Sequence, residues 1–261
     1  MKSPTQTFIV FCLCVLFPWQ ASAACNDRVL HVHGRDRSEI ICTPSKSTSP
    51  VPVVLVFHGR GGNAKDVAEG IRLHELWPEA LVVYMEGLPG IPAPYDPEGR
   101  GAGWQLNAGE ANDRDIAFTD ATLDTLAQQF NVDQRHVFAV GHSNGASFIG
   151  VLWATRAQRF DGFAFSASQA DQLITSADPK SVFMGMGMRD ELIPFTQQRK
   201  SIQYATTRFG MAPVRADQPG VNLYRNKNGI ELMTAIYTSG HTWPAEQSQL
   251  IVDFFKRQLQ K

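Results

Sequence analysis

The chain has 261 residues, of which 43% are hydrophobic and 19% charged, and its formal net charge is −1. This length and balance are typical of one globular domain with a large core, or of two small ones. A nearly neutral chain without a basic stripe is poorly suited to bind a phosphate backbone, which argues against nucleic acid as a partner.

The first residues have the pattern of a secretion signal. Lys2 supplies a short positive region, Phe8–Phe17 is an apolar run, and Ala21-Ser22-Ala23 gives the small residues that signal peptidase cleaves. The apolar run is shorter than the roughly 20 residues that span a bilayer. We therefore expect a signal peptide at residues 1–24, a single domain at residues 25–261, and a secreted or periplasmic location without a membrane partner. A buried N-terminal helix and lipidation of the first mature cysteine are the alternatives.

The expected mature chain keeps two cysteines, Cys25 and Cys42. Two cysteines in an oxidising compartment usually pair. They flank two strand-like stretches, Arg28–Val32 and Glu39–Cys42, with Gly34-Arg35-Asp36 as the turn between them. A hairpin would bring the cysteines together, so we expect a Cys25–Cys42 disulfide, and two separate, partly buried thiols are the alternative.

Metal ligands are not grouped in this sequence. It has no CxxC motif and no cluster of cysteine with histidine. His31 and His33 would share one face of a strand, and a solvated face explains them better than a pair of ligands. We expect neither a metal nor a cofactor.

Apolar, β-branched runs alternate with helical patterns through the rest of the chain. Such runs are typical of strands in a parallel sheet that is covered on both faces. The expected strands are Pro52–Phe57, Ala80–Tyr84, His136–Val140, Phe163–Ser166, Val182–Gly185 and Leu232–Tyr237, and the expected helices are Asp115–Phe130, Ser143–Arg156, Phe195–Phe209 and Ala245–Gln258. This alternation predicts an α/β fold with a mostly parallel, doubly wound sheet and helices on both faces.

One connection, Glu86–Gly103, is too rich in glycine and proline to form a regular element. A loop of this length in a compact domain is usually functional or disordered. Because it follows a strand, we expect it at the carboxyl edge of the sheet, where open α/β sheets bind ligands. Trp104 and Trp243, and less strongly Tyr95, are candidates for a substrate-binding wall, with ordinary packing as the alternative for each.

A G-x-S-x-G pentapeptide, Gly141-His142-Ser143-Asn144-Gly145, lies between an expected strand and an expected helix. In that context the glycines permit a turn so sharp that the serine takes a strained backbone and exposes its Oγ. The helix N-terminus adds amide donors and the positive end of a dipole. The pattern predicts Ser143 as a nucleophile, and a glycine-rich turn with an inert serine is the alternative.

A second glycine-rich motif, His58-Gly59-Arg60-Gly61-Gly62-Asn63, follows the strand Pro52–Phe57. Its glycines let the backbone bend so that an amide faces the nucleophile. We expect the backbone N–H groups of Arg60 and Asn144 to form an oxyanion hole, with the Arg60 side chain pointing to solvent. A glycine-rich turn without function is the alternative.

The acid and the base of such a site follow the serine in the order Asp, His. Asp190 comes after the strand Val182–Gly185, and His241 comes just before the last helix. Glu191 and Asp171 compete as the acid. The other histidines considered are held in their own turns or lie on an expected helix, namely His58, His142 and His74. We therefore expect His241 to accept the serine proton while Asp190 fixes its tautomer.

The motifs HGRGGN, GHSNG, GMRDELIP and GHTWP together resemble the secreted polyhydroxybutyrate depolymerase and feruloyl esterase-like family of α/β hydrolases. They run from position 58 to position 244, and GHTWP is the most specific of them. Asn112–Phe118 and Asn131–Arg135 are also similar to the family. The resemblance implies the α/β-hydrolase fold and a serine carboxylic ester hydrolase that forms an acyl-enzyme intermediate.

Members of this family that degrade polymers often carry extra disulfides and a separate polymer-binding module. Two cysteines in the mature chain favour a soluble ester instead: a feruloyl or aryl ester, an acetylated sugar or a hydroxyalkanoate oligomer.

A serine peptidase of the prolyl oligopeptidase type shares the fold and triad but usually adds a gating propeller, for which this chain is too short. A catalytically inactive hydrolase fold that serves as a binding protein is the other alternative.

Overall fold

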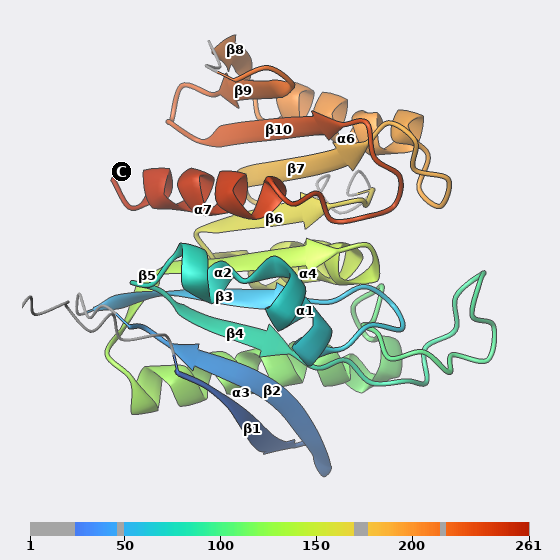
Figure 1. Ribbon diagram of the computed structural model, residues 1–261, viewed down its shortest axis with the longest axis vertical. Helices are drawn as coiled ribbons and strands as arrows, with labels where there is room; N and C mark the ends of the chain where they lie inside the picture. Colours follow the sequence, from blue (N-terminus) through green and yellow to red (C-terminus); the bar gives the residue numbers. More distant parts are fainter. Residues whose placement is uncertain (1–23, 46–49, 170–176, 215–217, 261) are drawn as a thin grey trace, which may run out of the picture.

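The computed structural model describes residues 24–45, 50–169, 177–214 and 218–260, and these form one ten-stranded sheet with helices on both faces (Figure 1). The strand order is β1-β2-β4-β3-β5-β6-β7-β10-β9-β8. The strands are β1 Ala24–Val32, β2 Arg35–Thr43, β3 Val51–Phe57, β4 Leu81–Met85, β5 Val132–His142, β6 Gly162–Ser166, β7 Ser181–Gly187, β8 Ala212–Val214, β9 Val221–Arg225 and β10 Glu231–Tyr237.

The middle of the sheet is parallel and both of its edges are antiparallel. Neighbouring strands from β4 through β3, β5, β6 and β7 to β10 pair in parallel. β1 and β2 at one edge, and β9 and β8 at the other, pair antiparallel. The predicted mostly parallel, doubly wound sheet is confirmed, and the short outer strands β8 and β9 extend it beyond the predicted runs.

Helices cover the two faces of the sheet in two groups (Figure 1). α1 Ala64–Ile71, α2 Leu73–Leu76 and α7 Gln247–Gln258 lie on one face, and α3 Arg114–Gln129, α4 Asn144–Arg156 and α6 Phe195–Arg208 lie on the other. Two single turns of 3₁₀ helix precede α3 and follow α4, at Glu110–Asp113 and Ala157–Arg159. The four predicted helices all form, with ends within two residues of those expected. Within the described ranges, no helix has the length and hydrophobicity needed to span a membrane.

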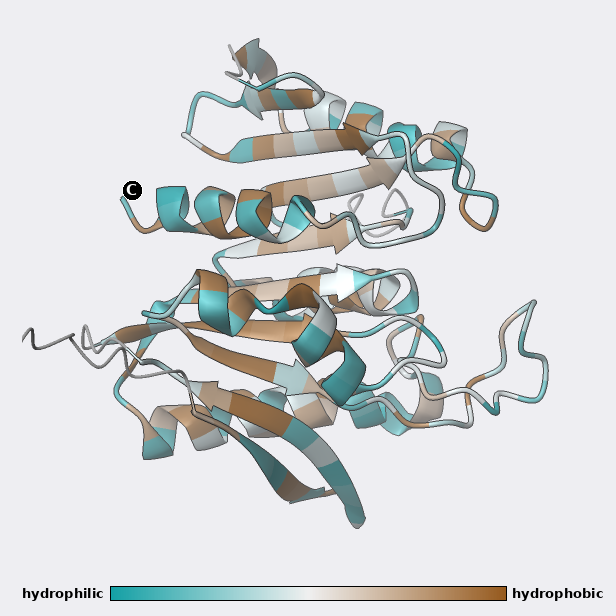
Figure 2. Ribbon diagram, in the orientation of Figure 1, coloured by the Kyte–Doolittle hydropathy of each residue, from teal (hydrophilic) through white to brown (hydrophobic). Residues whose placement is uncertain are grey.

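Alternate residues of the central strands supply two cores, one under each group of helices. Val53, Leu55 and Phe57 of β3 join the core under α3, α4 and α6, whereas Val54 and Val56 join the core under α1, α2 and α7. In Figure 2 the colours of the central strands mark mostly hydrophobic residues. Each fully buried side chain of this size contributes roughly 1.5–3 kcal/mol. The continuous apolar runs in the sequence therefore reflect burial on both faces.

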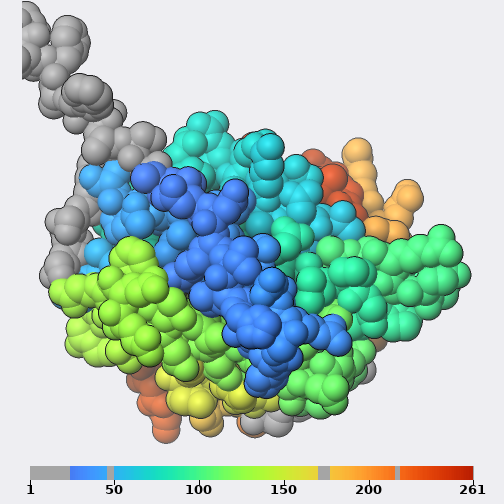
Figure 3. All heavy atoms as spheres, turned by 90° about the horizontal axis from the view of Figure 1, so that it is seen from below, coloured from blue at the N-terminus to red at the C-terminus, as the bar shows by residue number. Residues whose placement is uncertain are grey.

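The hairpin of β1 and β2 has a tighter turn than predicted. His33 and Gly34 both have positive φ, 49° and 76°, and Arg35 and Asp36 already belong to β2. Two-residue turns with positive φ at both positions match the twist of paired strands. The predicted turn at Gly34-Arg35-Asp36 is therefore wrong, and so is the predicted strand face with His31, since His33 lies in the turn. Figure 3 shows this hairpin beside α3, with the loop after β4 projecting at one side.

Cys25 and Cys42 pair across this hairpin and form the predicted disulfide, with their Cα atoms 4.0 Å apart. Cys42 is fully buried and Cys25 is exposed. In the part of the chain that the structure describes, one group of metal-ligating residue types comes together, namely these two cysteines with His74. Disulfide sulfurs are not thiolates, so this group is not a ligand set for a metal.

Removing the disulfide should destabilise the fold. The double change Cys25→Ser and Cys42→Ala should lower the free energy of unfolding by about 2–4 kcal/mol, because the bond limits the freedom of the unfolded chain. The bond joins positions 17 residues apart. Urea unfolding of the two proteins measures the difference, and mass mapping without reductant should find the linked peptide. Two freely alkylated thiols in the purified protein, unfolded without reductant, would contradict the expectation.

Candidate active site

The chain turns sharply at Ser143, between β5 and α4. Ser143 has φ 53° and ψ −117°, a strained conformation for a residue with a side chain. A Cβ at Gly141 would lie 2.5 Å from the backbone N of Ala146, and a Cβ at Gly145 would lie 2.5 Å from the carbonyl oxygen of His58. Both glycines are thus required because backbone packs against backbone at this turn.

Three side chains from different strand ends form a continuous hydrogen-bonded chain. Nε2 of His241 lies 2.8 Å from Oγ of Ser143, and Nδ1 of His241 lies 2.9 Å from Oδ2 of Asp190. Asp190 follows β7 and is 6% exposed, and His241 lies between β10 and α7. This arrangement allows the imidazole to accept the hydroxyl proton while the carboxylate holds its other nitrogen.

The Asp190 carboxylate is held by further donors. Oδ1 accepts from the backbone N–H groups of Leu192 and Ile193, at 3.0 and 2.8 Å. Oδ2 also accepts from Nε2 of Gln198, at 2.9 Å, and Gln198 is a buried residue of α6. Sequence reasoning missed Gln198, and the signal available was a polar residue on the inward face of a helix. These contacts fix the rotation of the carboxylate that faces His241.

The competing residues do not join this chain of hydrogen bonds. Glu191 is exposed, and Asp171 lies outside the described residues. His58 is buried, where Nδ1 contacts the Gly59 carbonyl at 2.7 Å and Nε2 accepts from the Gly87 N–H at 2.9 Å. His74 contacts the Tyr84 hydroxyl at 2.8 Å. Both histidines are engaged in the structure around them, as the sequence indicated for His58.

His142 packs behind the base. Its ring centroid lies 5.2 Å from that of His241, and its Nδ1 lies 3.3 Å from Oγ of Ser166. The Ser166 hydroxyl in turn accepts from Nε2 of Gln247 on α7, at 2.9 Å. Burial, and second the nearby His241, lower the pKa of His142 to about 4. A neutral His142 therefore adds no positive charge beside His241.

Buried histidines predict that the protein loses stability in mild acid. Burial lowers the pKa of His58 and of His74 as well as that of His142. An unfolded histidine titrates near pH ~6.5, so the unfolded chain binds more protons below that pH, and the free energy of unfolding should fall as pH drops from about 6.5 towards 4. His142→Gln should make this fall smaller, as measured by urea unfolding at about pH 7 and about pH 5. An identical pH dependence in the two proteins would contradict the assignment.

The HGRGGN loop lies against the nucleophile. A Cβ at Gly59 would be 3.4 Å from Cβ of Ser143. The Arg60 amide forms no hydrogen bond within the described part of the chain. The Asn144 amide belongs to the first turn of α4, where N–H groups have no partner inside the helix. Both amides that were predicted as oxyanion donors therefore belong to residues near Ser143 in the fold, and their role stays a prediction.

The Arg60 side chain does not point to solvent, and that prediction is wrong. Only 4% of it is exposed. Its Nη1 donates to the Ile91 carbonyl at 2.7 Å and lies 3.3 Å from Oδ2 of Asp96. The cause is the long loop after β4, which folds back over the HGRGGN loop.

The two tryptophans have different surroundings. Trp104 is fully buried, its Nε1 donates to the His58 carbonyl at 2.9 Å, and its ring stacks on Phe148 at 5.5 Å. Its predicted place in a substrate-binding wall is therefore wrong, and core packing is its role. Trp243 is half-buried, and its Nε1 donates to Oγ of Ser248 at 3.0 Å. Its ring packs edge-to-face with His142, with the two ring centroids 6.2 Å apart. Trp243 stays a candidate beside the site, and Tyr95 is 60% exposed.

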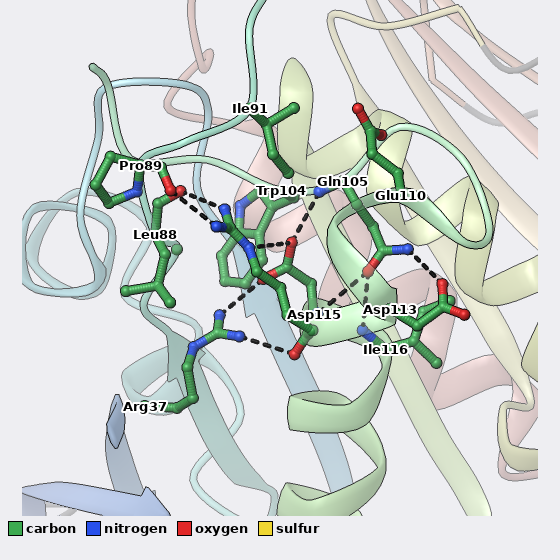
Figure 4. A network of polar contacts seen from close by, with 12 residues as sticks. Arg37, Leu88, Pro89, Ile91, Trp104, Gln105, Glu110, Asp113, Asp115 and Ile116 are labelled. Atoms are coloured by element: carbon green, nitrogen blue, oxygen red, sulfur yellow. Dashed lines mark hydrogen bonds and ion pairs between the residues drawn. The ribbon is translucent and has the colours of Figure 1, made fainter. Parts of the chain in front are cut away.

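The loop Glu86–Gly103 contains no regular strand or helix, as predicted, and a buried polar network holds its base (Figure 4). Arg37 of β2 pairs with Asp115 of α3 at 2.9 Å. Arg114 donates at 2.8 Å to the carbonyl oxygens of Leu88 and Pro89. The Gln105 N–H donates to Asp115 at 2.8 Å. Sequence reasoning missed this network, because its members are far apart in the chain.

The chain was compared with protein-family models, with curated proteins and with solved structures. No family model matches the chain. Over 170 residues it is 29% identical to "Probable feruloyl esterase C" of Aspergillus clavatus, and this alignment covers 64% of this chain and 58% of that protein. Over 192 residues it is 24% identical to feruloyl esterase C of Emericella nidulans, and this alignment covers 73% of this chain and 68% of that protein. The structure matches that of an acetyl xylan esterase from Aspergillus awamori with a TM-score of 0.68 at 14% identity, over 88% of this chain and 99% of that one.

Fold and sheet topology place the chain in the α/β-hydrolase class. Within that class the chain is feruloyl esterase-like in sequence, as the resemblance implied. The matched region spans less than two thirds of the Aspergillus clavatus relative. The polyhydroxybutyrate depolymerase part of the resemblance stays a prediction.

Proposed function

We propose that the protein is a carboxylic ester hydrolase in which Ser143 is the nucleophile, His241 the general base and Asp190 the acid that orients it. The observation that carries the proposal is the hydrogen-bonded chain from Ser143 Oγ through His241 to Asp190, with contacts of 2.8 and 2.9 Å. The strained turn at Ser143 and the esterases to which the chain is similar support it.

The reaction follows from this geometry. As Oγ of Ser143 attacks the ester carbonyl, Nε2 of His241 takes its proton, and the carbonyl oxygen becomes an oxyanion. The amides of Arg60 and Asn144 bind that oxyanion, and each such donor typically lowers the barrier by about 2.7–4 kcal/mol. His241 then passes the proton to the leaving alcohol. Water, deprotonated by the same nitrogen, releases the acid from the acyl-enzyme and restores the serine.

The substrate we propose is a soluble ester of a feruloyl or other aryl acid, an acetylated sugar or a hydroxyalkanoate oligomer. The relatives are named feruloyl esterases, and a structural neighbour is named an acetyl xylan esterase. We also propose that the protein is exported, with residues 1–24 as its signal peptide. Those residues up to position 23 lie outside the described part of the chain, and the Cys25–Cys42 disulfide fits an oxidising compartment.

A substrate screen tests the proposal. The purified protein should hydrolyse at least one of four panels, namely feruloyl, acetyl-sugar, short acyl and hydroxybutyrate-oligomer esters. A fluorophosphonate probe should label Ser143 in the same preparation. Labelling with peptide cleavage but no ester cleavage would favour a peptidase, and the absence of both labelling and turnover would favour an inactive binding protein.

A further inference from the structure

The two residues whose amides serve the oxyanion in the proposed function also have side chains that are buried against one loop. Arg60 lies in the HGRGGN loop and Asn144 begins α4. Both side chains contact segment 91–104, which follows β4 and comes from neither of their own elements. We call segment 91–104 the anchor segment.

Arg60 makes the first connection to the anchor segment. Its Nη1 binds the Ile91 carbonyl at 2.7 Å and the Asp96 carboxylate at 3.3 Å. Asp96 in turn accepts from the backbone N–H groups of Arg100 and Gly101, at 2.9 and 3.1 Å. One guanidinium nitrogen thus binds the anchor segment at two points, Ile91 and Asp96, and connects both to Arg60, whose amide serves the oxyanion. Next to it, the Gly61 N–H donates to the Ala102 carbonyl at 2.7 Å.

Asn144 makes the second connection. Its Oδ1 accepts from the Trp104 N–H at 2.8 Å, and its Nδ2 donates to the Trp104 carbonyl at 3.1 Å. A Cβ at Gly103 would lie 2.7 Å from Oδ1 of Asn144 and 3.4 Å from Cζ of Arg60. Glycine at position 103 is therefore what allows both side chains to reach the same stretch of backbone.

We propose that Arg60 and Asn144 are positioning residues: their side chains both bind the anchor segment, and this clamp holds the two oxyanion amides at their catalytic spacing. This inference rests on the proposed function and adds a specific task for the long loop. Because the oxyanion forms only during reaction, loosening the clamp should lower kcat while KM for a small ester changes little.

Arg60→Met tests the clamp while keeping the backbone amide. We expect kcat for p-nitrophenyl acetate to fall about 10- to 100-fold, with KM changed by less than about threefold. The affinity for a boronic acid, which imitates the tetrahedral state, should fall in parallel with kcat/KM. Arg60→Lys should recover most of the activity, because a single nitrogen makes both contacts in the wild type. Arg100→Met is the matched control: it removes an exposed guanidinium from the same segment but keeps the backbone N–H that donates to Asp96, so kcat should be unchanged.

Different outcomes separate this inference from the proposed function. If the wild type hydrolyses the ester and Arg60→Met has the same kcat, the clamp is overturned and the proposed function stands. A wild type that hydrolyses no ester would overturn the proposed function and the clamp with it. If Arg60→Met fails to fold, Asn144→Ala decides the question, because it also keeps its amide and breaks both bonds to Trp104. Wild-type kcat in that variant would overturn the clamp, and a fall in kcat without a matching change in KM would support it.

Discussion

Replacing Ser143 with alanine should abolish ester hydrolysis and leave the fold intact. The hydroxyl oxygen is the atom that would bond to the substrate, and in the described part of the chain it is the partner of Nε2 of His241, at 2.8 Å. Loss of a nucleophile that works as a unit with its base typically costs about 10⁶-fold in kcat, and the residual rate comes from the oxyanion donors and binding. Alanine keeps the Cβ and the same backbone strain, so thermal unfolding should change little.

Steady-state hydrolysis of one soluble ester near neutral pH measures this effect. Ser147→Ala is a matched control, because Ser147 lies one turn further along α4 and its hydroxyl bonds to the Ser143 carbonyl and to Ser168 rather than to His241. The control should keep nearly normal activity. A Ser143→Ala enzyme that retains more than about a hundredth of the wild-type kcat would refute Ser143 as the nucleophile.

The parts of this protein that were predictable from sequence have local signatures. Near-continuous apolar runs identify strands that are buried on both faces, and Val51–Phe57 is such a strand throughout. The residues Ser143, Asp190 and His241 each stand next to a strand end, and strand ends of a parallel sheet gather at one edge. Their order and neighbours were therefore enough to predict that they meet.

What could not be predicted depends on contacts between distant segments. The Arg60 side chain is buried because Asp96 and Ile91, more than thirty residues away, fold over it. Trp104 is buried because the end of the same loop packs on α4. Gln198 stands out in the sequence only as a polar residue on the inward face of a helix, and its partner, Asp190, is known only once α6 is docked. Neither hydrophobic periodicity nor a short motif records such contacts.

Replacing Asp190 with asparagine should lower kcat by at least about 10²-fold with little change in KM, and up to about 10⁴-fold as in the serine proteases. The surroundings of the carboxylate explain why. Oδ1 accepts two backbone N–H groups, so the asparagine oxygen must take that place and its NH₂ group must replace Oδ2. That NH₂ group then donates towards Nδ1 of His241, which leaves the proton on Nε2, where it blocks acceptance of the Ser143 proton.

The fold should tolerate this change, because the asparagine oxygen keeps both backbone N–H groups and Nε2 of Gln198 keeps its bond to the Ile193 carbonyl, at 2.6 Å. Thermal unfolding of Asp190→Asn should therefore stay close to that of the wild type. Glu191→Gln is the neighbouring control and should be nearly fully active, since Glu191 is exposed. Asp171→Asn tests the remaining competitor in the same assay. A crippled Asp171→Asn enzyme beside a nearly normal Asp190→Asn enzyme would move the acid to the loop after β6, while Ser143, His241 and the oxyanion amides would keep their proposed roles.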